Sequence, residues 1–388
     1  MVKPLTRPRL CFVVASDMTA KAFLLDHLRA LSKCFDVTLV LNTKAPDLLA
    51  DSGIEGHVVP LGIERNISLR RDLGALLYLI RFFRRNRFDA VHSVTPKAGL
   101  LAMMAAWMAG VPIRTHTFTG QVWVTRKGTV RRLLKSLDGL TARLSTCALA
   151  DSASQLDFLI AEGVVDPAAS GVLASGSISG VDTTRFRYDA ETRERIRREM
   201  GLEDDVVLLL HLGRLTIDKG VLDLAQAFDR ASTPGRRLHL LFVGPDEANL
   251  KEMLYEAAGA SRERMSFLGF TDKPESYMSA ADVLCLPSYR EGFGSVIIEA
   301  AAAGIPSVAS RIYGVVDAVE DGVSGLLHQP HDVAAIESLI GMLADNPEER
   351  RRLGEQAQAR VMKLFRKEVV VGALCEYYET KLSCFDES

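Results

Sequence analysis

Short apolar runs alternate with longer segments of helical period along the whole chain. In the first half, strands are predicted at 10–16, 37–42, 57–61, 89–94, 113–118, 147–152 and 170–177. Helices are predicted between them at 19–33, 72–87, 97–109, 129–143 and 152–162. Apolar strands separated by helices are typical of parallel sheets whose strands are joined by crossover helices.

The pattern pauses in a turn-rich and then charged segment at 176–193 and starts again after it. Further strands are predicted at 206–214, 238–244, 265–270, 283–288, 306–310 and 325–329. The chain of 388 residues is too long for one ordinary core. We therefore expect an α/β protein of two Rossmann-like, doubly wound domains, 1–180 and 181–388, that face a cleft. The helical tail after residue 346 is long enough for its last helix to pack back on the first domain.

Net charge is distributed unevenly between the two halves. Residues 1–180 carry a formal charge of +8 and the remainder −10, which together give −2. A basic half joined to an acidic half suggests a different partner for each. The six cysteines show neither the paired spacing of a metal site nor a disulfide framework, so reduced thiols in a cytosolic protein are expected.

The segment HLGRLTIDKG, 211–220, places two cations beside a predicted strand-to-helix turn. Arg214 follows the glycine that ends the strand, and Lys219 precedes the next helix. The beginning of a helix favours anions, and two cations beside it suit a diphosphate. Each cation alone would be read as an ordinary surface residue, so the order of elements carries this hypothesis.

The segment EGFGSVIIE, 291–299, combines two glycines with two glutamates in small or apolar surroundings. A carboxylate in such a setting is costly unless something pairs with it. The backbone amides that open the helix can bind phosphate or sugar oxygens, and Glu291 and Glu299 can accept hydrogen bonds from vicinal hydroxyls. The residues expected to contribute backbone contacts are Gly292, Phe293, Gly294, Ser295 and Val296.

In this order and spacing, HLGRLTIDKG, EGFGSVIIE, AAAGIPSVAS and DGVSGLL resemble the retaining glycosyltransferases of family four, which have the GT-B fold. The resemblance implies that Arg214 and Lys219 bind the diphosphate of a nucleotide-sugar. It places Glu291 beside the hydroxyls of the donor sugar, as a catalytic residue, and Glu299 on the ribose. Phe270 and Thr271, in the segment FLGFT, take the position of the nucleotide base.

The first half resembles the members of this family that build bacterial capsule, O-antigen and glycan-lipid chains. The resemblance lies in HSVTPKAGLLAMMAAWMAGVPIRTHTFTG, and it implies that His116, at the end of a strand, lies near the transferred sugar as a second catalytic residue. Many members have a Gly-Gly loop after the first strand, where this chain has ASDMTAK. The residues expected to contact the acceptor are Ser16, Asp17, Met18 and Lys97.

Several other kinds of site are not predicted. The chain has no Asp-x-Asp triplet at a strand end, so no metal and no other cofactor are expected, and cations and helix amides would neutralise the leaving diphosphate. It has no Cys/His cluster for zinc, no GxxxxGK[ST] phosphate loop and no basic stripe interleaved with aromatic residues. Nucleic acid is therefore not an expected partner.

Two stretches, 81–88 and 126–137, mix Arg and Lys with Phe and Leu. Such faces bind anionic lipid surfaces, although an ordinary solvated face would have the same composition. The longest charge-free run, 98–113, has 16 residues and contains Gly and Pro, so it predicts a buried helix and turn rather than a membrane span.

The sequence therefore predicts a metal-independent, retaining glycosyltransferase. Its donor would be a nucleotide-sugar, UDP-linked, that supplies a hexose or N-acetylhexosamine. Its acceptor would be a lipid-linked glycan on the inner face of the cytoplasmic membrane, to whose anionic surface the protein would bind peripherally. Two alternatives are a nucleotide-sugar 2-epimerase of the same architecture and a non-catalytic nucleotide-sugar-binding subunit.

Overall fold

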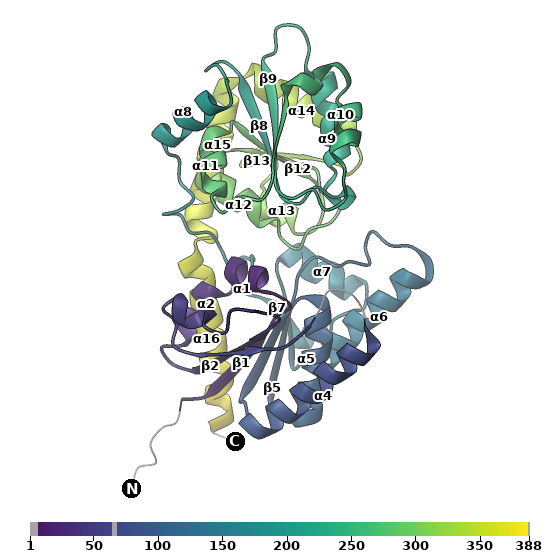
Figure 1. Cartoon of the computed structure of the whole chain (residues 1–388), viewed down its shortest axis with the longest axis vertical. Coiled ribbons are helices and arrows are strands. Elements are labelled where there is room, and N and C mark those ends of the chain that lie inside the picture. Colours follow the sequence, from purple (N-terminus) through teal and green to yellow (C-terminus); the bar gives the residue numbers. More distant parts are fainter. Residues whose placement is uncertain (1–6, 64–67, 387–388) are drawn as a thin grey trace. The chain divides into compact units, whose positions relative to one another are not determined.

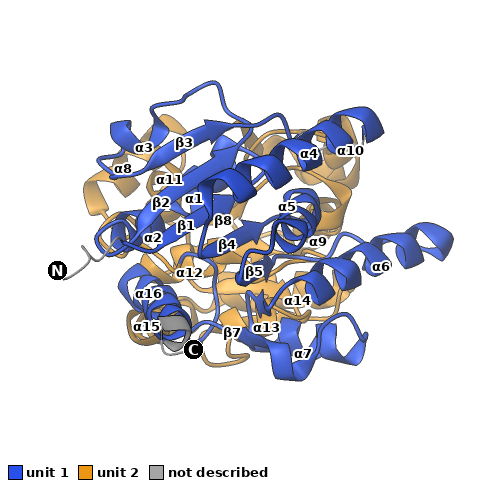
Figure 2. Cartoon of the chain, turned by 90° about the horizontal axis from the view of Figure 1, so that it is seen from below, with its two compact units in different colours: residues 1–179, 367–388 blue, residues 180–366 orange. Residues whose placement is uncertain are grey.

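The computed structural model describes residues 7–63 and 68–386, with side chains up to residue 383. The chain forms two compact units (Figures 1 and 2). Unit 1 consists of Met1–Ser179 and Lys367–Ser388, and unit 2 of Gly180–Arg366. The C-terminal helix α16 (Lys367–Asp386) therefore belongs to the unit that contains the N-terminus.

Unit 1 is built on a parallel sheet with the strand order β3-β2-β1-β4-β5-β6-β7 in the described residues. Both faces of this sheet are covered by helices (Figure 1), so its central strands are buried on both sides and form continuous apolar runs. The strands are β1 (Arg9–Val13), β2 (Asp36–Leu41), β3 (His57–Pro60), β4 (Ala90–Val94), β5 (Ile113–Phe118), β6 (Cys147–Ala150) and β7 (Ser170–Val172).

One face of this sheet forms a core with α1 (Asp17–Phe23), α2 (Leu25–Leu31), α3 (Leu48–Asp51) and α16, to which α16 contributes the buried Leu374 and Tyr378. The opposite face is covered by α4 (Leu69–Asn86) and α5 (Pro96–Ala109). The remaining helices of the unit are α6 (Gly128–Leu144), α7 (Ala153–Ala161) and a short 3₁₀ turn at Pro167–Ala169.

Two of the predicted elements of unit 1 differ most from the structure. The single helix expected at 19–33 is two helices, because Leu24 has a backbone conformation that interrupts the first one. The strand expected at 170–177 ends at Val172, because Ala174, Gly176 and Ser177 all have positive φ angles that an extended strand does not accommodate.

Unit 2 has a second parallel sheet, with the strand order β10-β9-β8-β11-β12-β13 in the described residues. The order reverses between β8 and β11, which makes the loops after these two strands the topological switch point of the sheet. The strands are β8 (Val207–Leu212), β9 (Leu238–Val243), β10 (Met265–Leu268), β11 (Val283–Leu286), β12 (Ser307–Ser310) and β13 (Gly325–His328).

Helices cover both faces of this sheet as well (Figure 1). One core includes α9 (Val221–Ala231), α10 (Lys251–Ala257) and α14 (Val333–Asp345). The other includes α8 (Ala190–Glu199), α11 (Pro274–Ala280), α12 (Ser295–Ala302), α13 (Val315–Ala318) and α15 (Pro347–Leu364). Short 3₁₀ turns lie at Ile217–Lys219 and Gly259–Arg264.

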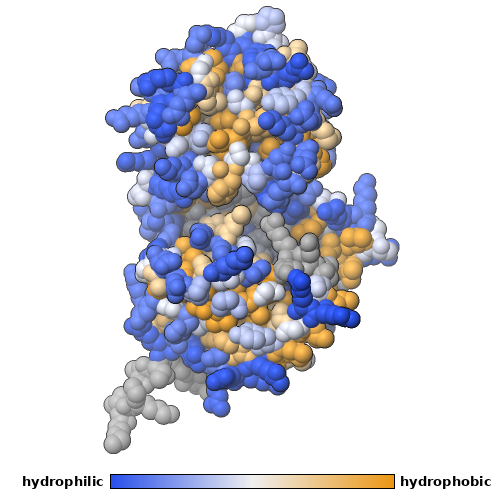
Figure 3. Space-filling model, in the orientation of Figure 1, coloured by the Kyte–Doolittle hydropathy of each residue, from blue (hydrophilic) through white to orange (hydrophobic). Residues whose placement is uncertain are grey.

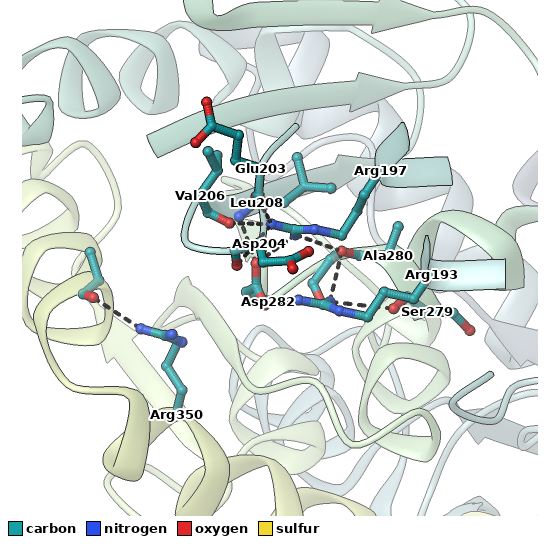
Figure 4. Close-up of polar contacts among 12 residues, drawn as sticks. Arg193, Arg197, Glu203, Asp204, Val206, Leu208, Ser279, Ala280, Asp282 and Arg350 are labelled. Carbon is teal, nitrogen blue, oxygen red and sulfur yellow. Dashed lines mark hydrogen bonds and ion pairs between the residues drawn. The ribbon is translucent and has the colours of Figure 1, made fainter. Parts of the chain in front are cut away.

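A buried charge cluster fastens α8 to the amino end of the unit 2 sheet (Figure 4). Asp282, just before β11, accepts hydrogen bonds from Arg193 at 2.8 Å, from Arg197 at 3.2 Å and from the Leu208 backbone N–H at 2.7 Å. Arg197 also donates to the carbonyl oxygen of Glu203 at 2.9 Å. The cluster lies at the amino end of the sheet, whereas the switch-point loops lie at its carboxyl end. Its role is therefore structural.

Candidate functional site

The loops that follow β8 and β11 meet at the switch point of unit 2. The backbone N–H of Tyr289 donates to the carbonyl oxygen of Asp218 at 2.8 Å. Gly220 has a φ of +66°, and a Cβ added there would collide with the carbonyl group of Pro287. This close approach holds the two loops together and requires glycine at position 220.

Lys219 and Glu291 come from these two loops and form an ion pair, with Nζ 2.5 Å from Oε1. Their side chains are only 20% and 13% exposed, so both charges are largely removed from water. The sequence places them 72 residues apart, and the switch point brings them together. In this state each charge compensates the other, and both lie where an open α/β sheet binds its ligand.

Arg214, the second predicted diphosphate residue, follows the same strand end. Its Nη1 lies 2.8 Å from Oε2 of Glu247, and both side chains are 40% exposed. The turn is tight, because a Cβ added at Gly244, after β9, would collide with the carbonyl group of Gly213. An exposed ion pair of this kind is weak, so Arg214 can exchange its carboxylate partner for another anion at little cost.

The helix predicted after EGFG is α12, which begins at Ser295. Gly294 precedes it with a φ of +83°, a conformation that favours glycine. Phe293 is buried and packs edge-on against Phe365, with ring centroids 5.2 Å apart. The glycine turn therefore fixes the start of α12 beside Glu291, with the backbone groups of Gly292, Ser295 and Val296 around it.

Glu299 is the fifth residue of α12 and is half-buried. No hydrogen bond links its carboxyl group to another of the described residues. Burial raises the pKa of Glu299 to about 7; Arg185 acts to lower it and Glu275 to raise it. A carboxyl group of this kind lacks a partner and gains most from a ligand that donates hydrogen bonds.

The predicted base segment lies just beyond β10. Phe270 is 72% exposed, and the hydroxyl oxygen of Thr271 accepts a hydrogen bond from the Lys273 backbone N–H at 3.1 Å. An exposed aromatic ring after a strand end offers a flat apolar surface on which a base can stack.

Sequence reasoning missed His211, which lies in β8, the strand that precedes Arg214 and Lys219. The ring is fully buried, and its Nδ1 lies 3.1 Å from the carbonyl oxygen of Cys285. The pKa of His211 is lowered to about 4, mainly by burial and also by Lys219, while the Cys285 hydrogen bond and Glu291 act in the opposite direction. The indication in the sequence was a histidine inside the apolar run VVLLLHL.

In unit 1, His116 does not lie at the end of a strand, as the sequence suggested. It is the fourth of six residues of β5, and its ring is only 2% exposed. Its Nδ1 lies 2.8 Å from Oγ of Ser93, and the ring packs so closely on Gly99 in α5 that no Cβ could fit there. Burial lowers the pKa of His116 to about 3, although the hydrogen bond to Ser93 raises it. His116 is therefore a neutral, enclosed imidazole.

The predicted acceptor residues lie after β1 and β4, the two strands that flank the switch point of unit 1. Ser16 caps α1, with its Oγ 3.4 Å from the Thr19 nitrogen, and Met18 is 64% exposed. Asp17 has one carboxylate oxygen that is buried without a hydrogen-bond partner. Lys97 forms a 2.6 Å ion pair with Asp72, which joins α5 to α4 and gives Lys97 a structural role.

Cys11, Cys34, Cys147, Cys285 and Cys375 are free thiols, while the Cys384 side chain lies outside the described part. No group of three or more His, Cys, Asp or Glu side chains in this part is arranged to hold a metal ion.

Two family models match the chain. The model described as "Glycosyl transferase 4-like domain" matches residues 21–173, and "Glycosyl transferases group 1" matches 192–360. The capsular polysaccharide biosynthesis glycosyltransferase CapM of Staphylococcus aureus is 29% identical over 84% of this chain and 85% of its own length. The UDP-Gal:α-D-GlcNAc-diphosphoundecaprenol α-1,3-galactosyltransferase of Escherichia coli is 27% identical over 80% of this chain and 81% of its own.

Solved structures share the architecture. HepE of Anabaena in complex with UDP-glucose has a TM-score of 0.78 and 19% identity, covering 96% of this chain and 99% of that protein. WaaG, a glycosyltransferase involved in lipopolysaccharide biosynthesis, has a TM-score of 0.72 and 16% identity, covering 95% and 98%. At these identities the likeness concerns the fold, which is GT-B.

Proposed function

Because this chain belongs to the GT-B glycosyltransferases of family four, we propose that it moves a hexose or N-acetylhexosamine from a nucleotide-sugar to a lipid-linked saccharide, with retention of configuration. The proposed donor is UDP-linked, and the product belongs to a bacterial surface glycan. The observation that carries the proposal is the Lys219–Glu291 pair at the switch point of unit 2.

In the proposed donor site, different residues around this pair bind different parts of the nucleotide-sugar. Lys219 and Arg214 bind the diphosphate, the amides at the start of α12 bind phosphate and sugar oxygens, and Glu291 accepts hydrogen bonds from the sugar hydroxyls. Glu299 accepts hydrogen bonds from the ribose, and the base lies at Phe270. The UDP and UDP-glucose complexes of the similar HepE fold support a uridine nucleotide.

In the proposed reaction the acceptor hydroxyl attacks the anomeric carbon on the face that the leaving group occupies. The bond from this carbon to the β-phosphate oxygen breaks, and its electron pair leaves with the nucleoside diphosphate. The hydroxyl proton passes to a phosphate oxygen. Lys219 and Arg214 neutralise the charge that develops on the diphosphate, so no covalent enzyme nucleophile is needed.

The names of the similar proteins support the acceptor class. One acts on a sugar linked to diphosphoundecaprenol, and another belongs to capsular polysaccharide biosynthesis. A lipid-linked acceptor would place the protein at the cytoplasmic face of the membrane.

Product analysis tests the function. A thermal-shift panel with UDP-, GDP- and dTDP-sugars comes first, because a ligand at about 100 times its Kd stabilises the fold by about 2.7 kcal/mol. The donor that binds is then incubated with and without an undecaprenyl-diphosphate saccharide. Transfer only with the acceptor supports the proposal. Release of an epimerised sugar without the acceptor identifies a 2-epimerase, and binding without turnover identifies a non-catalytic subunit.

Metal independence is part of the same proposal. Lys219 and Arg214 supply positive charge where a metal would otherwise be needed, so transfer should continue at an unchanged rate in excess EDTA. The initial rate of transfer is measured first in EDTA and then after Mg²⁺ or Mn²⁺ has been added back. Activity that disappears in EDTA and returns with either metal would contradict this assignment.

The membrane proposal rests on one side of unit 1. In α4, Leu69, Leu73 and Leu77 recur every fourth residue and are exposed, with Leu69 83% exposed. The exposed Trp107 of α5, which packs on α4, and Leu133 of α6, which packs on α5, extend the apolar surface. Hydrophobic and hydrophilic residues are intermixed on the face of unit 1 that Figure 3 shows. Exposed arginines flank these residues at 81, 84, 85, 87 and 132.

This mixture suits the surface of an anionic bilayer, where each cation contributes about 1 kcal/mol. No helix in residues 7–63 and 68–386 has the length and hydropathy needed to cross a bilayer. We propose that α4, α5 and α6 lie on the membrane surface.

Charge reversal tests the membrane surface. Sedimentation with vesicles that contain anionic lipid should remove most of the protein from solution, and binding should weaken with salt. Replacing Arg84, Arg85 and Arg87 with glutamate should release it. The matched control reverses three exposed arginines of unit 2, at 198, 262 and 351, and should still bind. Equal sedimentation of the wild type with neutral and anionic vesicles would show that the face is only solvated.

Two conservative substitutions distinguish the proposed roles of Glu291 and Glu299. Glu299→Gln should weaken binding of free UDP, because Glu299 faces the ribose. Glu291→Gln should leave UDP affinity nearly unchanged and lower turnover, because its hydrogen bonds matter most as charge develops on the sugar. His116→Ala should also spare UDP binding. Calorimetry measures affinity, and the reverse pattern for the two glutamates would mean that their roles are exchanged.

A further inference from the structure

Tyr289 lies two residues before Glu291, in the loop that follows β11, and its side chain contacts two other elements of unit 2. Its hydroxyl group donates a hydrogen bond at 2.7 Å to Oδ2 of Asp223, in the first turn of α9. Its ring packs against the ring of His331, in the turn between β13 and α14, with centroids 3.9 Å apart. Nδ1 of His331 also lies 3.8 Å from Oδ2 of Asp223. The three side chains therefore join three segments that are distant in the sequence.

His331 has a backbone conformation that is unfavourable for a residue with a side chain. Its φ is +66°, and with Pro330 it forms the centre of a turn that the Asp332 N–H closes on the carbonyl oxygen of Gln329 at 3.2 Å. Proline followed by a residue of positive φ is typical of a type II turn, whose second central residue is usually glycine or asparagine. Strain of this kind persists where the surrounding structure holds it, and it is common beside binding sites. The contact with Tyr289 therefore gives the His331 ring a defined place, although its side chain is 68% exposed.

These side-chain contacts add to two backbone contacts that fix the path of the chain toward Glu291. The carbonyl group of Pro287 lies against Gly220, and the Tyr289 N–H donates to the carbonyl oxygen of Asp218 at 2.8 Å. Both backbone contacts hold the loop to the segment after β8. The side chain of Tyr289 holds it in addition to α9 and to the turn before α14. The position of the carboxylate at residue 291 thus depends on contacts made just before it in the chain.

We propose that Tyr289 is a positioning residue that sets the place of the Glu291 carboxylate beside the transferred sugar. This inference rests on the proposed function, in which Glu291 accepts hydrogen bonds from the sugar hydroxyls. When the donor binds, Lys219 turns to the diphosphate, and its 2.5 Å contact with Glu291 is broken or shared. The contacts of Tyr289 with Asp223 and His331 do not involve the donor, so they hold the loop in both states. A displacement of about 1 Å near a reacting centre can cost about 100-fold in rate, which makes this attachment important for turnover.

Steady-state kinetics with the UDP-sugar found in the thermal-shift panel test the role of Tyr289. Tyr289→Ala removes the ring and the hydroxyl group, so it should lower kcat by about tenfold or more. The Kd for free UDP, measured by calorimetry, should change by less than about twofold, because Glu291 acts on the sugar and not on the nucleotide. Tyr289→Phe keeps the ring contact with His331 and should recover part of the rate. His331→Asn tolerates the positive φ but removes the ring, so its kcat should also fall.

A double-mutant cycle distinguishes positioning of Glu291 from a general structural role. Glu291→Ala leaves no carboxylate to be positioned, so adding Tyr289→Ala to it should slow transfer by no more than about a further twofold. Tyr255→Phe is the matched control, because Tyr255 lies in α10 of the same unit and packs on Phe267 with ring centroids 5.2 Å apart. This control should keep the kcat of the wild type. Thermal melts check that each variant is folded.

The outcomes separate this inference from the proposed function. A wild-type kcat in Tyr289→Ala, an equal loss of rate and of UDP affinity, or losses that multiply in the cycle with Glu291→Ala would each overturn the inference and leave the donor site intact. If Tyr289→Ala does not fold, Tyr289→Phe and His331→Asn decide, and an unchanged kcat in both would overturn it. Absence of transfer by the wild type from UDP-, GDP- and dTDP-sugars would overturn the proposed function and the inference with it.

Discussion

Asp282→Ala should lower the free energy of unfolding of unit 2 by about 3–5 kcal/mol, since removal of one partner leaves a buried charge uncompensated. Asp282 accepts hydrogen bonds from Arg193, Arg197 and the Leu208 N–H, and the Arg197 side chain is only 4% exposed. Without the carboxylate, the Arg197 guanidinium would keep only carbonyl acceptors such as that of Glu203. Asp282→Asn still offers an oxygen to the Leu208 N–H, so it should lower the free energy of unfolding less than Asp282→Ala.

Hydrogen exchange measures this effect with an internal control. Peptides from β8 and β11 should lose protection, whereas peptides from β1 and β4 in unit 1 should not. Asp205→Ala is the matched variant, because Asp205 pairs with Arg237 at 2.7 Å on the surface, where its side chain is 61% exposed. It should change protection little. Equal losses in Asp282→Ala and Asp205→Ala would mean that the buried cluster contributes no more than a surface pair.

The strands were readable from the sequence for a definite physical reason. Parallel strands covered on both faces appear as continuous apolar runs, and β5 was predicted with its observed bounds, 113–118. What a run does not reveal is the face to which each side chain points. His116 was placed in the correct strand but wrongly at its end. Its enclosure by Ser93 and Gly99 could not be predicted from the run, because these residues belong to β4 and α5, which pack against β5.

Contacts between residues that are distant in the sequence could not be predicted either. The motifs predicted that Lys219 and Glu291 belong to one site, but not that they pair with each other. Neither the Lys97–Asp72 nor the Arg214–Glu247 contact follows from local sequence pattern, because each depends on how neighbouring elements pack. The sequence suggested that the last helix could return to the first domain, but not that Leu374 and Tyr378 would join the core built by the first strands.

The ion pair at the switch point has a consequence for binding. Before a diphosphate can bind Lys219, the 2.5 Å contact with Glu291 must be broken or shared. Lys219 is thus held in the site by Glu291 when the donor is absent, which reduces the side-chain entropy that binding must overcome. This gain opposes the cost of breaking the pair, so removal of the Glu291 charge alone should change UDP affinity little.

Lys219→Ala should therefore weaken binding of UDP-glucose by about tenfold or more. The loss of a charge-assisted hydrogen bond costs about 1.5–3 kcal/mol, and each 1.4 kcal/mol is about tenfold in Kd. The variant also leaves the Glu291 carboxylate without its partner beside the diphosphate, which adds repulsion. Calorimetry of the wild type and the variant gives the ratio of Kd values, and a thermal melt checks that the variant is folded.

Further variants test whether the loss of UDP-glucose affinity in Lys219→Ala comes from the lost charge in the site. Arg214→Ala should also weaken binding, because its surface partner Glu247 leaves it available to the diphosphate. Arg237→Ala removes an ion-paired arginine at the amino edge of the same sheet and should leave Kd unchanged. In Lys219→Ala combined with Glu291→Gln, the repulsion disappears, so part of the affinity should return. If both Lys219→Ala and Arg214→Ala bind UDP-glucose as tightly as the wild type, the diphosphate does not lie at this switch point.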